Sequence, residues 1–126
     1  MRVLCIDDDP TMCQLLADIL GGFGHTVCTA PDAETALAFL ELEPFDLLCL
    51  DGRLSSGLSG PALAARLGDS VPIVAVTGDN TSAREFRQLG IETITKPFSV
   101  PELMGAIDVA LGMEVLMCES SLSMLV

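Results

Sequence analysis

Residues 3–10, with the sequence VLCIDDDP, place four apolar residues directly before three carboxylates and a proline. A short apolar run of this kind is typical of a buried strand. Three adjacent negative charges repel one another, and weak solvent screening at the end of a buried strand increases that repulsion. Asp9 and Pro10 fit the start of a helix, with Asp9 as its N-cap and Pro10 in its first turn. Asp7 and Asp8 therefore need a different explanation.

Strand and helix patterns alternate along the rest of the chain. Asn80 or Thr81 is the expected N-cap of the fourth helix, and Ser99 with Glu102 forms a capping box for the fifth. The pattern indicates one α/β domain with five βα units and a parallel sheet covered by helices on both faces. Strands are predicted at residues 3–7, 26–29, 46–51, 71–77 and 92–95, and helices at residues 10–22, 33–42, 61–67, 80–89 and 99–111.

Polar side chains follow the predicted strands at the points where they end. Asp7 and Asp8 follow the first strand, Asp51 ends the third, Thr77 ends the fourth and Lys96 follows the fifth. Ligands of open α/β sheets bind at the carboxyl ends of the strands, where these residues should gather. Three carboxylates make a site of hard oxygen ligands that suits Mg²⁺. A bound cation would convert the repulsion among the acids into binding energy.

Four short motifs follow one another along the chain: IDDDP (6–10), LCLDGRL (48–54), AVTG (75–78) and TKPF (95–98). Together, in this order, they resemble the receiver domain of two-component response regulators. The resemblance covers residues 1–112 and implies a flavodoxin-like three-layer sandwich with the strand order 2-1-3-4-5. Residues 113–126 form a C-terminal tail whose structure the sequence does not define. Each motif alone is weak, but all four at strand ends of a (βα)5 pattern are specific.

The resemblance implies a phosphoacceptor and a magnesium site. Asp51 would take a phosphoryl group from a phosphohistidine and form an aspartyl phosphate. Asp8, Asp51 and the backbone carbonyl of Arg53 would hold Mg²⁺, and Asp7 would act on the ion through water. The metal would offset charge on the attacking and leaving oxygens during transfer.

The resemblance also assigns roles to two residues on the last strands. Lys96 would pair with a phosphoryl oxygen as a point charge. Thr77 would hydrogen-bond another phosphoryl oxygen. The peptide between Lys96 and Pro97 is expected to be cis, as in relatives.

Three functional classes compete. The first is a phosphorylated receiver that catalyses only its own phosphorylation and dephosphorylation. The second is a receiver-like interaction module that works without phosphate, in which Asp7 and Asp8 act only at the start of the helix and Asp51 only ends a strand. The third is a metal-dependent phosphatase with an aspartyl nucleophile, which in the haloacid-dehalogenase-type family carries a second Asp two residues further on. Arg53 fills that position here, which disfavours turnover.

The sequence departs from the receiver pattern at three places. Thr93 stands three residues before Lys96, where receivers usually carry Tyr or Phe, so the ring that usually couples the site to the output face is missing at this position. The loop after Asp51 has the sequence LSSGLSG in place of the usual Met-Pro and is one residue longer than the commonest form. Arg53 and Asp79 lie where the family places residues beside the path of the hydrolytic water, and we expect the pair to slow loss of the phosphoryl group.

Composition limits the partners. The formal net charge of −12 disfavours direct binding to nucleic acid and to anionic membranes. The chain has five cysteines without a CxxC pair, and no pattern of a secretory leader is found, so we expect buried thiols in a reducing cytoplasm. The resemblance implies a histidine kinase or a histidine phosphotransfer protein as partner, and the chain is either a separate protein or a piece of a hybrid kinase. The apolar tail at residues 113–126 favours self-association.

Overall fold

The computed structural model describes residues 1–112, which form strands and helices in strict alternation. The tail predicted at residues 113–126 lies outside the described residues. The strands are β1 (Arg2–Ile6), β2 (Thr26–Ala30), β3 (Leu47–Leu50), β4 (Ile73–Thr77) and β5 (Glu92–Thr95). The helices are α1 (Pro10–Gly22), α2 (Ala33–Leu42), α3 (Gly60–Leu67), α4 (Asn80–Gln88) and α5 (Val100–Ala110).

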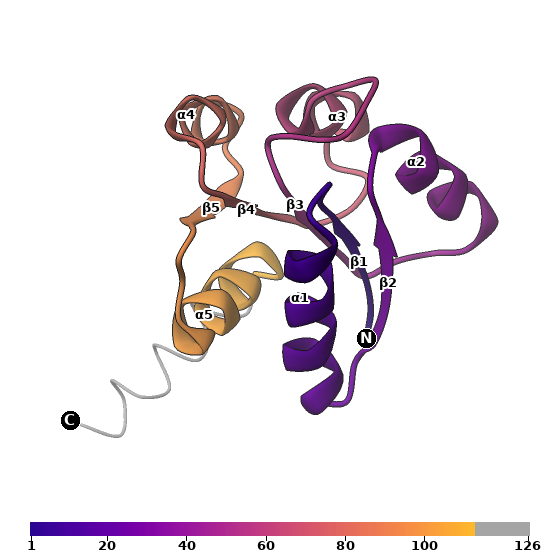
Figure 1. The fold of residues 1–126 in the computed structure, drawn as a ribbon, viewed down its shortest axis with the longest axis vertical. Helices are drawn as coiled ribbons and strands as arrows, with labels where there is room; N and C mark the ends of the chain where they lie inside the picture. Colours follow the sequence, from indigo (N-terminus) through magenta and orange to yellow (C-terminus); the bar gives the residue numbers. More distant parts are fainter. Residues whose placement is uncertain (113–126) are drawn as a thin grey trace.

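All five strands are parallel and form one sheet in the order β2-β1-β3-β4-β5. Helices α2, α3 and α4 cover one face of this sheet, and α1 and α5 cover the other (Figure 1). The flavodoxin-like order expected from the resemblance is therefore confirmed, and so are the three layers. Within the described helices, no segment has both the length and the apolar composition needed to span a membrane.

Strand β3 shows why a continuous apolar run becomes the middle of this fold. Leu48 and Leu50 pack into the core under α2, α3 and α4, whereas Leu47 and Cys49 pack into the core under α1 and α5. Successive side chains of a strand point to opposite faces, so a strand with a core on each side has no polar position. The four residues of β3 are accordingly all buried.

Helix starts follow the expected capping chemistry at two helices and differ at a third. Asp9 accepts a hydrogen bond from the backbone of α1, and Ser99 with Glu102 forms a complete capping box on α5. Helix α4 is capped by Asp79, which accepts from the backbone N–H of Ser82 at 3.2 Å, so the expected caps Asn80 and Thr81 are wrong. A carboxylate oxygen near the positive end of a helix is a stronger acceptor than an amide or hydroxyl oxygen.

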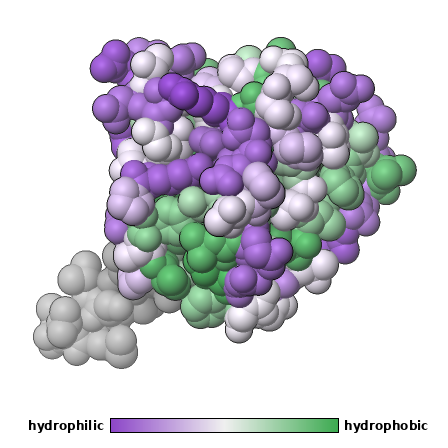
Figure 2. All heavy atoms as spheres, viewed as in Figure 1, coloured by the Kyte–Doolittle hydropathy of each residue, from purple (hydrophilic) through white to green (hydrophobic). Residues whose placement is uncertain are grey.

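The surface divides by hydropathy. In Figure 2 hydrophilic residues lie over α4 and hydrophobic residues gather over α1 and α5. Leu15 on α1 and Val109 on α5 are each more than two-fifths exposed. Solvated arginines such as Arg84 and Arg87 occupy α4, whose mean hydropathy is correspondingly low.

Candidate functional site

The carboxyl ends of four strands meet at one edge of the sheet and carry the polar residues singled out in the sequence. Ile6 on β1 lies level with Leu50 on β3 in the sheet register, so the next residues, Asp7 and Asp51, leave the sheet side by side. Thr77 is the last residue of β4, and Lys96 directly follows β5 at the same edge. Parallel pairing alone therefore brings together residues that lie up to 89 positions apart in the chain.

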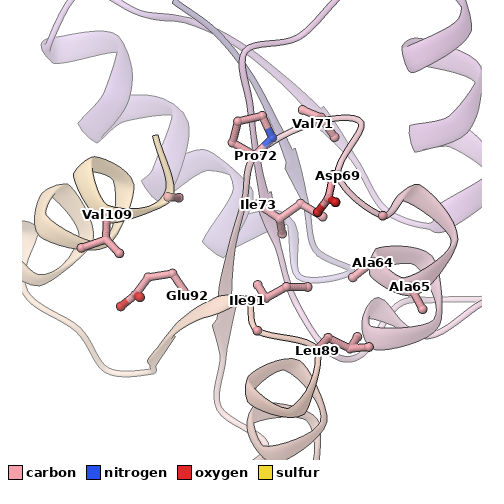
Figure 3. A pocket seen from close by; sticks show the side chains of 13 residues that line it. Ala64, Ala65, Asp69, Val71, Pro72, Ile73, Leu89, Ile91, Glu92 and Val109 are labelled. Carbon is pink, nitrogen blue, oxygen red and sulfur yellow. The ribbon is translucent and has the colours of Figure 1, made fainter. Parts of the chain in front are cut away.

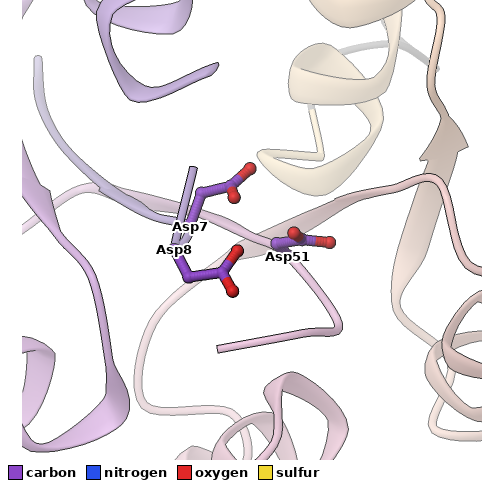
Figure 4. Close-up of side chains that lie close together, drawn as sticks. All are labelled: Asp7, Asp8 and Asp51. Atoms are coloured by element: carbon purple, nitrogen blue, oxygen red, sulfur yellow. The ribbon is translucent and has the colours of Figure 1, made fainter. Parts of the chain in front are cut away.

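Three carboxylates form the centre of the site. Asp7, Asp8 and Asp51 each offer an oxygen, and these oxygens all lie within 4.8 Å of one another (Figure 4). Asp7 is 3% exposed and Asp51 is 7% exposed, whereas Asp8 faces solvent. Two buried carboxylates and an exposed one present hard oxygen ligands to an ion arriving from solvent, and this donor set fits Mg²⁺.

Lys96 is the cation that holds the two buried acids. Its Nζ donates to Oδ2 of Asp7 at 2.8 Å and to Oδ2 of Asp51 at 3.3 Å. The backbone N–H of Lys96 donates to the carbonyl of Thr77 at 3.0 Å, which fixes where the side chain starts. The peptide between Lys96 and Pro97 is cis, as expected. Lys96 thus partly neutralises a pair of carboxylates that would otherwise be unpaired charges in the interior.

Burial dominates the electrostatics of Asp7. Desolvation raises the pKa of its carboxyl to about 6, although the hydrogen bonds from Lys96 and from the backbone of Asp9 act in the opposite direction. For Lys96 burial lowers the pKa, but the hydrogen bond to Asp7 and the charge of Asp51 outweigh it, so its pKa is raised. The ammonium group therefore stays charged, and Asp7 carries its negative charge at a cost.

Backbone groups, as well as the side chain of Lys96, fix the position of Asp51. The N–H of Gly52 donates to its Oδ1 at 2.7 Å, which leaves Oδ2 pointing toward Lys96. Gly60, the first residue of α3, lies directly against the Asp51 carbonyl, since a Cβ added there would sit 1.9 Å from that oxygen. A Cβ on Gly52 would lie 2.1 Å from the Cβ of Ser82 on α4. The sequence analysis missed both glycines, because close approaches between distant segments leave no periodic signal.

A cavity of about 450 Å³ opens beside Asp51 and Lys96. Thr77, fully buried, lies on its wall, and its Oγ1 accepts a hydrogen bond from the N–H of Asp79 at 3.2 Å. Arg53 forms an ion pair with Asp79 at the rim, with 3.7 Å between Nη2 and Oδ1. The side chain of Arg53 is 75% exposed and that of Asp79 is 24% exposed, so the pair is open to solvent.

Asp79 and Ser82 form a small hydrogen-bonded unit at the start of α4. The hydroxyl of Ser82 donates to Oδ2 of Asp79 at 2.6 Å. This bond, with the backbone N–H of Ser82 and the charge of Arg53, lowers the pKa of Asp79. Helix capping and the ion pair thus keep Asp79 negative at the rim of the cavity.

Thr93 on β5 lies apart from this cavity. Its hydroxyl donates to the carbonyl of Ile91, the residue just before β5, at 2.9 Å, and its side chain is partly buried. It pairs with Ala75 in the register of β4 and β5. The position that carries an aromatic ring in most receivers therefore holds a small side chain, hydrogen-bonded to the backbone two residues earlier.

Comparisons with known proteins agree with this geometry. Residues 3–108 match the family model of the response regulator receiver domain. The sensor histidine kinase GacS of Pseudomonas protegens is 34% identical over 113 residues, covering 81% of this chain and 12% of the kinase. The transcriptional regulatory protein TcrA of Mycobacterium tuberculosis is 32% identical over 109 residues, covering 82% of this chain and 43% of the regulator. The chain therefore spans less than half the length of these two curated relatives.

The solved structures point the same way. The crystal structure of the receiver domain of NtrX from Brucella abortus superposes with a TM-score of 0.80 at 32% sequence identity. The superposition covers 87% of this chain and 98% of the NtrX receiver domain. A putative response regulator from Chloroflexus aurantiacus superposes with a TM-score of 0.79 at 29% identity.

Proposed function

The chain belongs to the response regulator receiver domain family, whose members act as phosphoacceptors in two-component signalling, and we propose that Asp51 is its phosphoacceptor. One observation carries the proposal. The Asp51 carboxylate is buried at the end of a central strand, with one oxygen held by Gly52 and the other 3.3 Å from Lys96. A fixed carboxylate that opens on a cavity is positioned for attack on an incoming phosphorus.

The proposed reaction transfers a phosphoryl group from a phosphohistidine to Asp51. An oxygen of the Asp51 carboxylate attacks phosphorus, and the new P–O bond forms as the P–N bond breaks. The bonding pair returns to the imidazole nitrogen, which takes a proton from solvent, and the products are an aspartyl phosphate and a neutral histidine. Three phosphoryl oxygens then occupy the cavity that Thr77 and Lys96 line.

The side chains around Asp51 support the oxygens of this group. Lys96 already bonds Asp51, and its charged ammonium would pair with a phosphoryl oxygen. Thr77 would donate its hydroxyl proton to another oxygen, because that hydroxyl now only accepts from Asp79. Mg²⁺ bound by Asp8, Asp51 and the Arg53 carbonyl, with Asp7 acting through water, would neutralise charge on the transferred oxygens.

Arg53 and Asp79 are proposed to control how long the phosphoryl group remains. Their ion pair lies at the rim of the cavity, where water must pass to reach the phosphorus. An exposed pair contributes little energy, so its effect is to reduce access rather than to stabilise the fold.

Receiver domains in general are not turnover enzymes, and we propose the same for this chain. The residue two positions after Asp51 is Arg53, which cannot act as the second acid that a phosphatase with an aspartyl nucleophile uses. Receivers work with histidine kinases or phosphotransfer proteins, and such a protein is the proposed partner, with output through protein contacts. The free, buried Cys5, Cys13 and Cys49 fit a reducing compartment such as the cytoplasm.

The function is tested with phosphoramidate, a small donor whose phosphorus is bonded to nitrogen as in phosphohistidine. The wild type, Asp51→Asn and the matched control Asp69→Asn are incubated with donor and Mg²⁺, and phosphorylated protein is separated on a phosphate-affinity gel. We expect a shifted band for the wild type and Asp69→Asn, and none for Asp51→Asn. A shifted band in Asp51→Asn would reject Asp51 as the acceptor. No band in the folded wild type would favour the interaction module that works without phosphate.

A further inference from the structure

A second cavity lies at the opposite edge of the sheet from Asp51. It has a volume of about 530 Å³ and is bounded by the amino ends of β4 and β5 and by the ends of α3, α4 and α5 (Figure 3). Apolar side chains from these elements and from the loops that lead into β4 and β5 line it. They include Val71, Ile73, Leu89, Ile91 and Val109. Two carboxylates, Asp69 and Glu92, lie among them.

Two of the apolar residues are left open to solvent. Leu89 is 47% exposed and Val109 is 41% exposed, and both belong to the six large hydrophobic side chains that the described residues expose. Covering such side chains is favourable at about 25 cal/mol per Å² of apolar area. A hollow lined by partly exposed aliphatic side chains is therefore a surface that an apolar segment would stabilise.

The chain itself leaves the described structure at the rim of this cavity. Helix α5 ends at Ala110, and Gly112 has a φ of 74°, the left-handed conformation that ends helices. The N–H of Gly112 donates to the carbonyl of Val109 at 3.0 Å, which closes a turn directly after α5. Val109 and Ala110 both line the cavity. The described part of the chain, which ends at Gly112, therefore ends beside the hollow.

Residues 113–126 have the composition of a segment that needs cover. They carry no Lys or Arg, and Met113, Leu116 and Met117 follow the spacing that places apolar residues on one side of a helical segment. Fourteen residues reach about 21 Å as a helix and about 46 Å when extended, enough to cross the cavity in either form.

We propose that residues 113–126 dock across this cavity of their own chain and cover Leu89 and Val109. The occupant is the same chain rather than a second copy, because only Leu111 and Gly112 separate the segment from Ala110 at the rim. Covalent linkage gives the segment an effective concentration near the cavity in the millimolar range, well above that of a free partner. The proposal does not rest on phosphorylation, since the cavity and Asp51 lie at opposite edges of the sheet.

Disulfide trapping tests the proposal in the full chain. Asp69→Cys places a thiol at the cavity, and Thr81→Cys places a matched exposed thiol at the other end of α4, near Asp51. Native Cys118 lies in the segment, and it is the one cysteine between Gln88 and Val126. Trypsin cleaves after Arg66, Arg84 and Arg87, so either new disulfide joins residues 67–84 to residues 88–126 and is read by mass.

Both variants are oxidised with glutathione disulfide at micromolar protein concentration, after mixing with isotope-labelled protein to distinguish links within a chain from links between chains. We expect the link from Cys118 to position 69 to form within one chain at least ~10-fold faster than the link to position 81. Adding Leu116→Asp and Met117→Asp should remove that difference, because aspartates do not enter an apolar hollow. Equal rates, no link at position 69, or links only between chains would each overturn intrachain docking, and the last result would identify a second copy as the occupant.

Discussion

Strands β3 and β5 end at the same edge of the sheet but are built in different ways. Every residue of β3 is buried, and the strand has a neighbour on each side, with a core above and below. Strand β5 is an edge strand whose residues are partly or fully exposed. Asp51 directly follows β3, the central strand, as the receiver pattern requires. Thr93, on the edge strand β5, stands where receivers usually carry an aromatic residue.

This contrast separates the chemistry of the site from its transmission to a partner. The position of Asp51 depends on packing from both faces and on two close backbone contacts, so few substitutions are compatible with it. Thr93 lies on an edge strand, and its hydroxyl donates only to the nearby backbone carbonyl of Ile91. We infer that phosphorylation depends on the middle of the sheet, and that the residues of β5 can change with little effect on it.

The largest effect is expected at Gly60, which supports the backbone of Asp51. In Gly60→Ala the new Cβ would lie 1.9 Å from the Asp51 carbonyl oxygen. The atoms that it would meet belong to the backbone of Asp51 and Gly52, which cannot move aside as a flexible side chain can. We expect a loss of about 2–4 kcal/mol in the free energy of unfolding, together with slower phosphorylation. Urea unfolding measures the stability. Gly105→Ala on α5, which has open space around it, is the matched control and should be neutral or slightly stabilising.

The next effect concerns the cost of charge on Asp7. Its pKa in the folded state, about 6, lies above the ordinary value of 3.8, so the folded protein binds this proton more tightly than the unfolded chain. The penalty is therefore absent below about pH 4, develops as the pH rises toward 6 and is fully present above it. Without metal at pH 7.5, Asp7→Asn should be more stable than wild type by about 1–2 kcal/mol.

Urea unfolding in EDTA at pH 7.5 and at pH 4 measures this difference. Asp8→Asn, which alters an exposed acid of the same cluster, is the control and should gain much less at pH 7.5. If Asp7→Asn has the same stability as wild type at both pH values, burial of Asp7 does not impose the charge penalty inferred here.

A smaller, kinetic effect is expected at the rim of the site. Arg53→Ala removes the ion pair with Asp79 but keeps the backbone carbonyl proposed to bind Mg²⁺. We expect the phosphoryl group to be lost about 2- to 5-fold faster, consistent with the small energy of an exposed pair. The decay of phosphorylated protein after removal of the donor measures this rate. An unchanged rate would show that the pair does not restrict water.

The smallest effect on the chemistry is expected on β5, and a matched pair of threonines measures it. Thr93→Val removes a hydroxyl bonded to the backbone of Ile91, whereas Thr77→Val removes the hydroxyl that lines the phosphoryl cavity. Thr93→Val should change unfolding free energy by less than ~0.5 kcal/mol and leave phosphorylation within about 2-fold. Thr77→Val should slow phosphorylation clearly more. Equal losses in both variants would show that β5 takes part in the chemistry.

The fold could be predicted from the sequence because its signals are local. Apolar runs such as that of β3 and helix starts such as Asp9 with Pro10 fix the ten elements to within two residues at every end. The start of α4 was predicted correctly, but its N-cap residue was not. Three residues that can cap a helix, Asp79 to Thr81, follow one another there. Competition between adjacent polar side chains depends on the backbone conformation at the turn, which composition does not reveal.

The residues of the site could be predicted from the sequence, but the contacts that hold them in place could not. Asp7, Asp51, Thr77 and Lys96 stand at strand ends, and parallel pairing is enough to bring them together. The contact between Gly60 and the Asp51 carbonyl depends on how the lengthened loop closes, so it could not be inferred from spacing. The same limit applies to the bond from Ser82 to Asp79, which requires α4 to be placed first.

The most direct test is the intact mass of the protein after incubation with acetyl phosphate and Mg²⁺, compared between wild type and Asp51→Asn. A phosphoacceptor at Asp51 predicts one added phosphoryl group on the wild type, none when EDTA replaces Mg²⁺, and none on Asp51→Asn. An added phosphoryl group on Asp51→Asn, or no addition to folded wild type in the presence of Mg²⁺, would contradict it.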